Sequence, residues 1–291
     1  MFEGRVSNLS EALKLAASRF EEFGLESSLR EAEILLGAVF GLPRSSLYAH
    51  DSRVLTEAEK ASCEAIIEER LRGVPTQYIL GEQPFRYLNL KLEPGVFIPR
   101  PETEILVELV VSFALKETKP LTVVDLGTGS GAIALSIAYE VPETLVYAVD
   151  ISPSALEVAR VNARSHGLEE KVVLIRGDLF DGLADLKGEV DIVVSNPPYV
   201  RCEEMKSLSK EIRDFEPLLA LDGGVDGLKF HRRIVSESPL YLRAGGLLAL
   251  EVGYDQAGAV AALIEEVGCF NGIQISRDYA GIKRFVTALR R

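Results

Sequence analysis

Hydrophobic residues recur every three or four positions through residues 8–72, with polar residues between them. This is the period of amphipathic helices, in which one apolar face packs against neighbouring helices. Gly24 ends the first helical pattern. Thr56 and Glu59 have the spacing of a capping box, which marks the start of a later helix. No strand pattern interrupts the stretch. It therefore predicts a small helical domain, which we place at residues 1–75.

The pattern changes after the helical stretch. Over residues 85–92 hydrophobic and polar positions alternate, as in a strand with one buried face, and glycines and prolines on either side mark turns. We interpret residues 76–98 as an extended β-hairpin linker between two domains. Pro101, shortly after this linker, suits the first position of a helix.

From residue 121 onward, apolar runs typical of buried strands alternate with helical patterns. The expected strands cover residues 121–126, 144–149, 171–176, 191–195, 246–252, 271–276 and 284–288. Such alternation indicates an α/β fold with a mostly parallel sheet and helices on both faces. We assign residues 99–291 to this second domain, with a seven-stranded sheet.

Asp125 lies at the end of the first of these strands, and a glycine-rich turn joins the strand to a helix. The turn consists of Gly127, Thr128, Gly129, Ser130 and Gly131. Glycines let the backbone turn tightly and let a ligand approach closely, and the helix N-terminus behind them favours a negative group such as a carboxylate. The glycine spacing alone also fits a dinucleotide site or a purely structural turn.

Acidic residues at the strand ends narrow the choice of ligand. Asp125 is placed to meet an ammonium group, and Asp150, followed by Ile151, ends the second strand, where an acid can bind ribose hydroxyls. A ligand that combines ammonium, carboxylate and ribose is S-adenosylmethionine (SAM). The third strand leads to residues placed to give the adenine a polar contact and an apolar wall: Asp178, Leu179 and Phe180. This set resembles the class I SAM-dependent methyltransferases, which have a Rossmann-like fold, over residues 121–195.

A second motif follows the fourth strand, where ligand sites of open α/β sheets lie. This acceptor motif, residues 196–199, consists of Asn196, Pro197, Pro198 and Tyr199. The two prolines remove backbone N–H donors but leave the carbonyls free, and the residue before a proline is held extended. A rigid cluster of acceptors followed by an aromatic ring suits a planar –NH2 group. In this interpretation Asn196 Oδ1 and the Pro197 carbonyl accept its two N–H groups, and Tyr199 covers its face.

Further segments carry a resemblance to one family. An Asn-Pro-Pro-Tyr motif in this place is typical of methyltransferases that act on amino groups of adenine or cytosine, or on the side-chain amide of glutamine. Residues 97–104, 215–227 and 277–284 resemble the HemK/PrmC family, the glutamine methyltransferases of peptide chain release factors. The helical domain and the hairpin linker match that family too, so the resemblance covers nearly the whole chain.

The resemblance implies a reaction and a set of residues. The reaction is methylation of the glutamine side-chain nitrogen (N5) in the Gly-Gly-Gln motif of class 1 release factors, with SAM as donor and no metal. Asn196, Pro197 and Tyr199 are then the catalytic residues, with Asn196 also near the donor. Phe97, Arg100 and Glu104 join the acceptor motif in binding the substrate. Arg100 and Glu104 have an alternative role as a structural pair that fixes the linker. Leu179 stands where some relatives have tryptophan, so the adenine contact there is expected to be apolar.

The side chains around the acceptor motif limit the mechanism. An amide nitrogen is a poor nucleophile because its lone pair is delocalised, and no His, Cys or Lys adjoins the motif to act as a base. His50, His166 and His231 are dispersed, and we interpret them as ordinary surface or packing residues. Catalysis should therefore rest on orientation and on hydrogen bonds that stabilise positive charge developing on the nitrogen.

The net charge argues against one alternative class of protein, and the site residues argue against another. The 291 residues include 44 acidic and 32 basic ones, a net charge of −12, which does not attract a polyanion. An adenine N6 or other nucleic-acid amino methyltransferase, which shares the acceptor motif, should carry a basic groove or a target-recognition domain. A non-catalytic SAM-binding module of the translation apparatus would have no need of Asp125, Asp150 and Asn196 together.

The remaining composition bears on the compartment. The three scattered cysteines, Cys63, Cys202 and Cys269, have no metal spacing, which fits a reducing compartment. No apolar run approaches the roughly 20 residues of a membrane span. We expect a cytoplasmic monomer whose partners are class 1 release factors, with no membrane or direct nucleic-acid binding.

Overall fold

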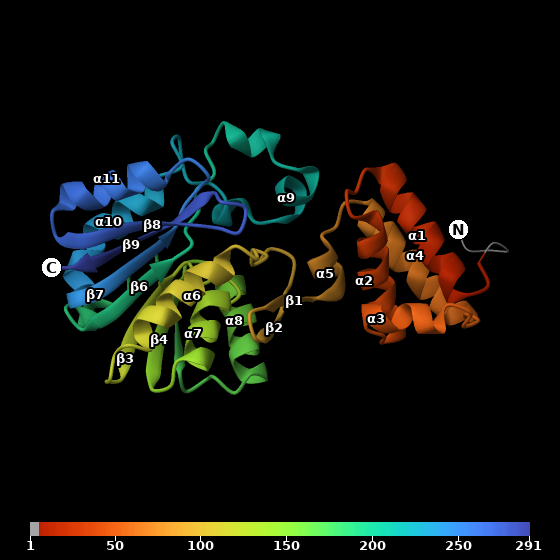
Figure 1. Cartoon of the computed structure of the whole chain (residues 1–291), viewed down its shortest axis with the longest axis horizontal. Coiled ribbons are helices and arrows are strands. Elements are labelled where there is room, and N and C mark those ends of the chain that lie inside the picture. The colour runs from red at the N-terminus through yellow and green to blue at the C-terminus, as the bar shows by residue number, and fades with distance from the viewer. Residues whose placement is uncertain (1–5) are drawn as a thin grey trace. The chain divides into compact units, whose positions relative to one another are not determined.

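The computed structural model describes residues 6–291. It divides into two compact units (Figure 1). One comprises Met1–Gly81 together with Lys210–Phe215, and the other comprises Glu82–Ser209 together with Glu216–Arg291. No helix within residues 6–291 is both long and apolar enough to cross a lipid bilayer.

The first unit is helical. Its helices are α1 (Leu9–Phe23), α2 (Ser28–Phe40), α3 (Arg44–Leu47), the 3₁₀ turn η1 (Tyr48–His50), α4 (Glu57–Leu71), α5 (Thr76–Leu80) and α9 (Lys210–Phe215). Its core is built from the apolar faces that the helical period predicts, including Phe20, Leu35 and Ile67. The capping box is confirmed, because Thr56 Oγ1 accepts from Glu59 N at 3.2 Å and the Glu59 carboxylate accepts from Thr56 N at 2.9 Å.

Two details of this unit differ from the sequence-based expectation. Residues 76–80 were expected to be extended, yet they form α5, since the Pro75 carbonyl accepts from Tyr78 N and Ile79 N and Gly81 ends the helix in the left-handed conformation. The unit also contains α9, which follows the acceptor motif in sequence. Buried Arg70 donates to Glu211 of α9 at 2.9 Å and to Glu31 of α2 at 3.1 Å.

The second unit is an α/β domain around a seven-stranded sheet. Its strands are β3 (Leu121–Leu126), β4 (Thr144–Asp150), β5 (Val172–Arg176), β6 (Val190–Ser195), β7 (Leu242–Glu251), β8 (Phe270–Arg277) and β9 (Lys283–Arg290). Their order is β5-β4-β3-β6-β7-β9-β8, and β9 pairs antiparallel with both neighbours while the remaining pairs are parallel. The seven-stranded, mostly parallel sheet is therefore confirmed.

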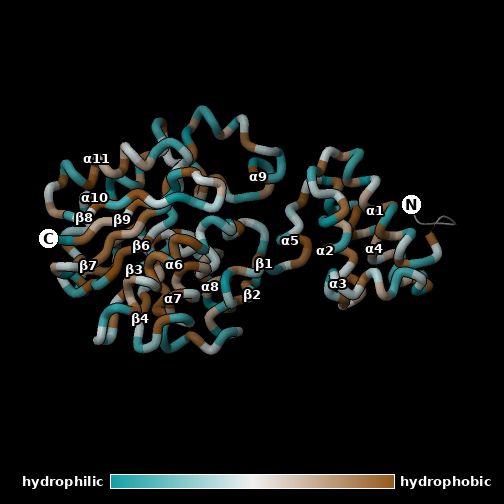
Figure 2. Tube along the Cα trace, viewed as in Figure 1, coloured by the Kyte–Doolittle hydropathy of each residue, from teal (hydrophilic) through white to brown (hydrophobic). Residues whose placement is uncertain are grey.

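Helices cover both faces of this sheet. They are α6 (Thr103–Ala114), α7 (Ala132–Glu140), α8 (Pro153–Ser165), α10 (Lys229–Tyr241) and α11 (Ala257–Val267), with 3₁₀ turns η2 (Ala184–Leu186), η3 (Glu204–Ser207) and η4 (Leu218–Ala220). Successive strand residues point to opposite faces. Val123 packs with α6 and α7, whereas Val124 packs with α10 and α11. Figure 2 shows the resulting concentration of hydrophobic residues along the central strands.

The predicted hairpin is present but is part of the second unit. Strands β1 (Glu82–Phe85) and β2 (Leu88–Lys91) pair antiparallel, and Phe85, Leu88 and Leu90 are buried in the core that contains α6 and α7. Buried Asn162 of α8 holds β2 by accepting from Lys91 N at 2.6 Å and donating to Lys91 O at 3.0 Å. Helix α6 begins at Thr103, so Pro101 lies in the turn before the helix and not at its first position.

Candidate active site

The strand register brings the predicted residues to one edge of the sheet. Leu126 of β3 lies opposite Val149 of β4 on one side and Ser195 of β6 on the other. The glycine turn, Asp150 and the acceptor motif directly follow these three residues, so they meet at the carboxyl ends of adjacent strands. This is where open α/β sheets bind ligands.

The glycine turn is fixed to the end of β4. Gly127 N and Thr128 N donate to Val149 O at 2.8 and 3.0 Å, and Gly129 N donates to Asp150 Oδ2 at 2.8 Å. Gly127 and Gly129 have φ values of 74° and 57°, which side chains with a Cβ rarely adopt. A Cβ on either glycine would meet no atom within 4 Å. Open space therefore adjoins both glycines.

Asp125 is fully buried beneath this turn. Thr128 Oγ1 donates to its Oδ2 at 2.6 Å, while its Oδ1 is buried without a hydrogen-bond partner. Burial raises the pKa of Asp125 to about 7, and the Thr128 hydrogen bond and the nearby Ala134 N–H act in the opposite direction. An unpaired buried carboxylate oxygen is costly, so the site favours a ligand that brings a donor or a positive charge.

Asp150 is tied to the backbone by both oxygens. Oδ2 accepts from Gly129 N, and Oδ1 accepts from Ser152 N at 2.9 Å. Burial raises the pKa of Asp150, against the effect of these hydrogen bonds. A carboxylate oxygen with one donor keeps acceptor capacity for ligand hydroxyls. Ile151, the next residue, is exposed at the same edge.

The residues expected on the adenine side have protein partners. Asp178 accepts from Arg233 of α10 at 2.8 and 2.9 Å. Phe180 is buried, and its ring stacks on Tyr241 with centroids 4.5 Å apart. Leu179 is buried in the left-handed conformation, with φ of 58°. The Phe180 ring is thus buried by packing in the core. Leu179 is held in a backbone conformation that bulky residues rarely adopt.

The acceptor motif is joined to α6 and β7 through side chains. Asn196 Nδ2 donates to Thr103 Oγ1 at 3.2 Å, and Thr103 Oγ1 donates to Glu251 Oε2 at 2.7 Å. Tyr199 donates its hydroxyl to Glu251 Oε1 at 3.4 Å, and its carbonyl accepts from Gln256 Nε2 at 2.9 Å. No group in residues 6–291 donates to Asn196 Oδ1. Pro197 is buried, while Pro198 and Tyr199 are partly exposed.

Buried titratable groups surround this motif. Burial raises the pKa of Glu251 to about 7, opposed by the Thr103 hydrogen bond and the charge of Arg284. Burial also raises the pKa of the Tyr199 hydroxyl. His231 is fully buried with Nε2 2.9 Å from Glu251 O, and burial lowers its pKa. His231 is thus a packing residue, as the sequence suggested.

Arg100 and Glu104 do not form a pair with each other. The Arg100 guanidinium pairs with buried Glu216 and lies 4.8 Å from the centroid of the Phe97 ring. Glu104 accepts from Arg86 N at 3.1 Å, in the turn between β1 and β2. The alternative of a structural Arg100–Glu104 pair is therefore wrong, because each residue has another partner.

Sequence reasoning overlooked two residues of the site, Thr103 and Glu251. Thr103 lies within segment 97–104, between the charged residues Glu102 and Glu104, and a lone hydroxyl there carries no pattern that marks a site. Glu251 lies next to the acceptor motif because Leu250 pairs with Ser195. It ends a predicted parallel strand at the same edge as Asp125 and Asp150, so the rule that found those acids also applies to Glu251.

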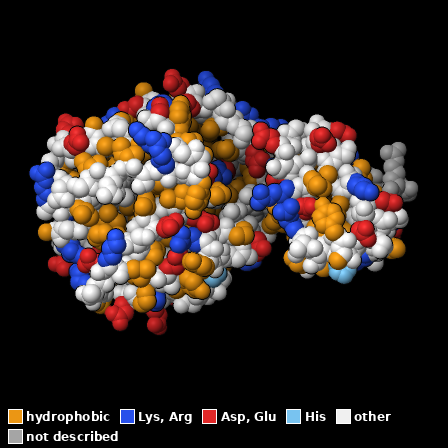
Figure 3. Space-filling model, viewed as in Figure 1, with side chains coloured by type: hydrophobic (Ala, Val, Ile, Leu, Met, Phe, Trp, Pro, Cys, Tyr) orange, Lys and Arg blue, Asp and Glu red, His pale blue; other side chains and the backbone are white. Residues whose placement is uncertain are grey.

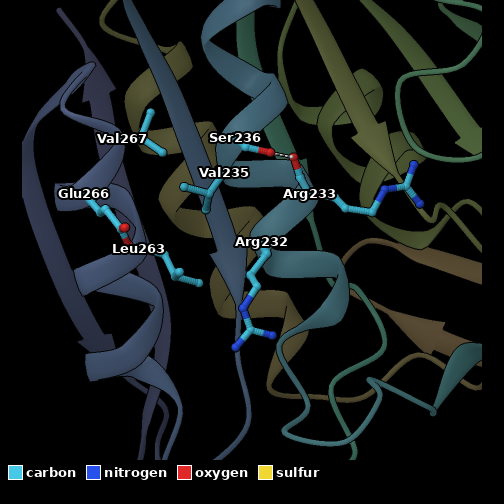
Figure 4. A pocket seen from close by; sticks show the side chains of 7 residues that line it. All are labelled: Arg232, Arg233, Val235, Ser236, Leu263, Glu266 and Val267. Atoms are coloured by element: carbon cyan, nitrogen blue, oxygen red, sulfur yellow. Dashed lines mark hydrogen bonds between the residues drawn. The ribbon is translucent and has the colours of Figure 1, made fainter.

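A separate hollow lies between α10 and α11. It has a volume of about 420 Å³ and is lined by Arg232, Arg233, Val235, Ser236, Leu263, Glu266 and Val267. Figure 4 shows that Arg232 and Arg233 extend in different directions. The Arg232 guanidinium pairs with Asp226, and the Arg233 guanidinium pairs with Asp178. No residue of the glycine turn or the acceptor motif lines this hollow.

Two further features concern charged side chains at the surface and residues that could bind a metal ion. On the face drawn in Figure 3, basic and acidic side chains are interspersed on both units. Among residues 6–291, no group of His, Cys, Asp and Glu side chains is arranged to hold a metal ion.

Comparison with known proteins places the chain in a family. Residues 11–81 match the family described as PrmC N-terminal domain, and residues 88–214 match the family described as methyltransferase small domain. The release factor glutamine methyltransferase of Moorella thermoacetica is 44% identical over 283 residues, 97% of this chain and 99% of that protein. The protein of the same name from Geobacter sulfurreducens is 40% identical over 268 residues, 91% of this chain and 90% of that protein.

A solved structure with a similar name matches part of the chain. It is a protein-(glutamine-N5) methyltransferase (release factor-specific) from Alicyclobacillus acidocaldarius, with 31% identity, coverage of 67% of this chain and 94% of that chain, and a TM-score of 0.41. The two relatives from Moorella thermoacetica and Geobacter sulfurreducens cover 97% and 91% of this chain, across both units. The chain belongs to the release factor glutamine methyltransferase family.

Proposed function

We propose that this protein transfers a methyl group from SAM to the side-chain nitrogen (N5) of the glutamine in the Gly-Gly-Gln motif of class 1 peptide chain release factors. The observation that carries the proposal is the acceptor motif. Its Asn196 amide nitrogen is held by Thr103, and its Oδ1 is left without a partner beside the Pro197 carbonyl. Two acceptors in a rigid backbone suit the two N–H groups of a primary amide.

The glycine turn and its acids suit SAM as the donor. The unpaired Oδ1 of Asp125 is matched by the ammonium of SAM, and the acceptor capacity left on Asp150 is matched by ribose hydroxyls. Open space beside Gly127 and Gly129 lets a ligand approach the backbone. We assign Thr128, Ser130, Gly131 and Ile151 to the surroundings of the donor, and Asp178, Leu179 and Phe180 to its adenine side. When bound, SAM supplies an electrophilic methyl group on sulfur.

The chain's own residues orient the acceptor. Asn196 Oδ1 and the Pro197 carbonyl accept the two N–H groups of the glutamine amide, which directs the nitrogen lone pair toward the donor. As the N–C bond forms and the S–C bond breaks, positive charge develops on the nitrogen and the same two acceptors stabilise it. The nitrogen then releases one proton to water. Tyr199 and Phe97 cover the amide, and Arg100 and Glu216 hold the Phe97 side of the site.

The helical unit is our candidate for the release factor docking domain. Residues 11–81 match the family described as PrmC N-terminal domain, and the unit also includes α9 from the loop after the acceptor motif. We therefore extend the docking domain from the expected residues 1–75 to residue 81. Because the substrate belongs to the translation machinery, we place the enzyme in the cytoplasm, where it acts as a monomer.

The variant Asn196→Ala tests the acceptor assignment. It removes one of the two acceptors, so kcat on release factor should fall by about 10²–10³-fold or more, while SAM binding measured by calorimetry largely survives. Asn271→Ala, at an exposed position of β8, is the matched control and should keep wild-type activity. Near-normal turnover by Asn196→Ala would contradict the assignment.

A further inference from the structure

A buried carboxylate lies beside the acceptor motif without an ion-pair partner. Glu251 is 2% exposed at the end of β7, and the donors to its side chain are the hydroxyls of Thr103 and Tyr199. Among the described residues, no Lys or Arg forms an ion pair with it, because the nearby Arg284 pairs with Asp278 at 3.2 Å. Burying an unpaired carboxylate is costly, and an apolar residue of similar size would stabilise the fold better.

The direction of each hydrogen bond follows from Glu251. When Glu251 is ionised, its carboxylate can only accept, so the single Thr103 hydroxyl proton points toward Glu251. The Thr103 oxygen then has only lone pairs to offer on its other side, where it meets the Asn196 amide at 3.2 Å. The amide must therefore turn Nδ2 toward Thr103. Its Oδ1 is directed away from Thr103 and remains free to accept.

We propose that Thr103 and Glu251 are positioning residues that fix which end of the Asn196 amide faces the substrate. This inference rests on the proposed function, because the orientation matters only for an acceptor with two N–H groups. If the Asn196 amide rotated by half a turn, its own N–H groups would face those of the glutamine and the site would repel its substrate. Neither Thr103 nor Glu251 contacts the substrate in this arrangement.

The pair Thr103→Val and Thr103→Ser tests the role of the hydroxyl. Valine keeps the shape but removes the acceptor for Asn196 Nδ2, so kcat should fall by about 10–10²-fold, the usual cost of losing a supporting hydrogen bond, with SAM affinity unchanged. Serine keeps the hydroxyl and should restore most of the activity. Assays at pH 8.5 keep Glu251 ionised. Thr144→Val, a buried threonine at the start of β4, is the matched control and should retain wild-type kcat.

A parallel pair of variants tests Glu251. Glu251→Gln keeps an oxygen that accepts from Thr103 and should retain most of the activity. Glu251→Met keeps a side chain of similar length but removes that acceptor. The Thr103 proton is then free to donate to Asn196 Oδ1, so kcat should fall as in Thr103→Val. Equal activities of these two variants, with wild-type melting temperatures, would overturn the role of Glu251.

A double-mutant cycle separates positioning from simple packing. If Thr103 acts through Asn196, adding Thr103→Val to Asn196→Ala should leave kcat unchanged, whereas a packing defect would multiply the two losses. Multiplied losses, or a Thr103→Val enzyme as active as wild type, would overturn the inference and leave the proposed function intact.

A measurement without substrate distinguishes the two proposals. In an ¹⁵N-labelled protein, the Asn196 side-chain resonance is identified by its loss in Asn196→Ala. Its N–H groups should exchange slowly in the wild type and in Thr103→Ser, and rapidly in Thr103→Val. Equal exchange in the wild type and in both variants overturns the inference. Exchange that follows this pattern supports the positioning role of Thr103, whether or not release factor is methylated. Failure to methylate release factor would overturn the proposed function alone.

Discussion

Asp125 shows at the residue scale how a ligand site costs stability. Its carboxyl group is buried with one oxygen unpaired, and burial raises its pKa to about 7 from the ordinary 3.8. Between pH 3.8 and about 7, the native protein therefore keeps a proton on Asp125 that the unfolded chain has lost. The Asp125 carboxyl group therefore contributes most to the free energy of unfolding below pH 4, and this contribution is lost as the pH rises to about 7.

Asp125→Asn should remove this dependence. Without SAM, the free energy of unfolding of the variant relative to wild type should increase between pH 4.5 and 7.5, by about 1–4 kcal/mol, and stay level above that range. Urea denaturation followed by circular dichroism measures it, with the exposed Asp185→Asn as the control for loss of one acidic residue. A difference that does not vary with pH would contradict the buried-carboxyl account. The same variant should bind SAM more weakly, because asparagine carries no charge.

The residues at strand ends were predictable, and their side-chain partners were not. Asp125, Asp150 and Asn196 could be named from sequence because each lies at or just after the end of an apolar strand of a parallel sheet. Arg100 pairs with Glu216 across 116 residues of sequence, and Asp178 pairs with Arg233 across 55. Such partners depend on how loops and helices pack against the sheet. No local pattern carries that information, so the Arg100–Glu104 pair was considered and proved wrong.

At the scale of elements, Asn162 ties three segments together. Its side chain exchanges hydrogen bonds with Lys91 of β2 and donates to Ser130 O in the glycine turn at 2.9 Å. The hairpin, α8 and the glycine turn are thereby held as one structure. The amide is fully buried, so its loss leaves the backbone groups of Lys91 and Ser130 unsatisfied in the interior.

Asn162→Ala should therefore destabilise the protein by about 2–4 kcal/mol, since several buried hydrogen bonds are lost together. Urea denaturation measures the loss, and Asn271→Ala at an exposed site should change stability by less than about 0.5 kcal/mol. The affinity for SAM should also fall, because the glycine turn loses a support. A variant as stable as the control would show that the hairpin is held by its apolar contacts alone.

The sequence located most elements because their apolar runs are long. The strands of the sheet and the helices covering it follow the periodicity, with ends that differ by a few residues. The short helices α5 and α9 were missed, since five or six residues carry too little periodicity. Their form comes from local capping and from contacts such as that between Arg70 and Glu211. The hairpin was found, but only packing reveals that Phe85 and Leu90 belong to the core of the second unit.

At the scale of the whole molecule, an acidic chain presents a site for a neutral amide. The net charge of −12 opposes non-specific attraction to nucleic acid. In the proposed function, the second unit supplies the chemistry and the helical unit recognises the release factor. End-to-end similarity to release factor glutamine methyltransferases fits this division.

Methylation of a purified release factor tests the central claim most directly. The protein is incubated with SAM labelled in the methyl group and, separately, with a class 1 release factor, the same factor with its Gly-Gly-Gln glutamine changed to alanine, transfer and ribosomal RNA, or DNA. Mass spectrometry of the digested factor should find one added methyl group, on that glutamine, with the alanine variant and the nucleic acids unlabelled. Label confined to RNA or DNA, or a release factor methylated at another residue, would contradict the account.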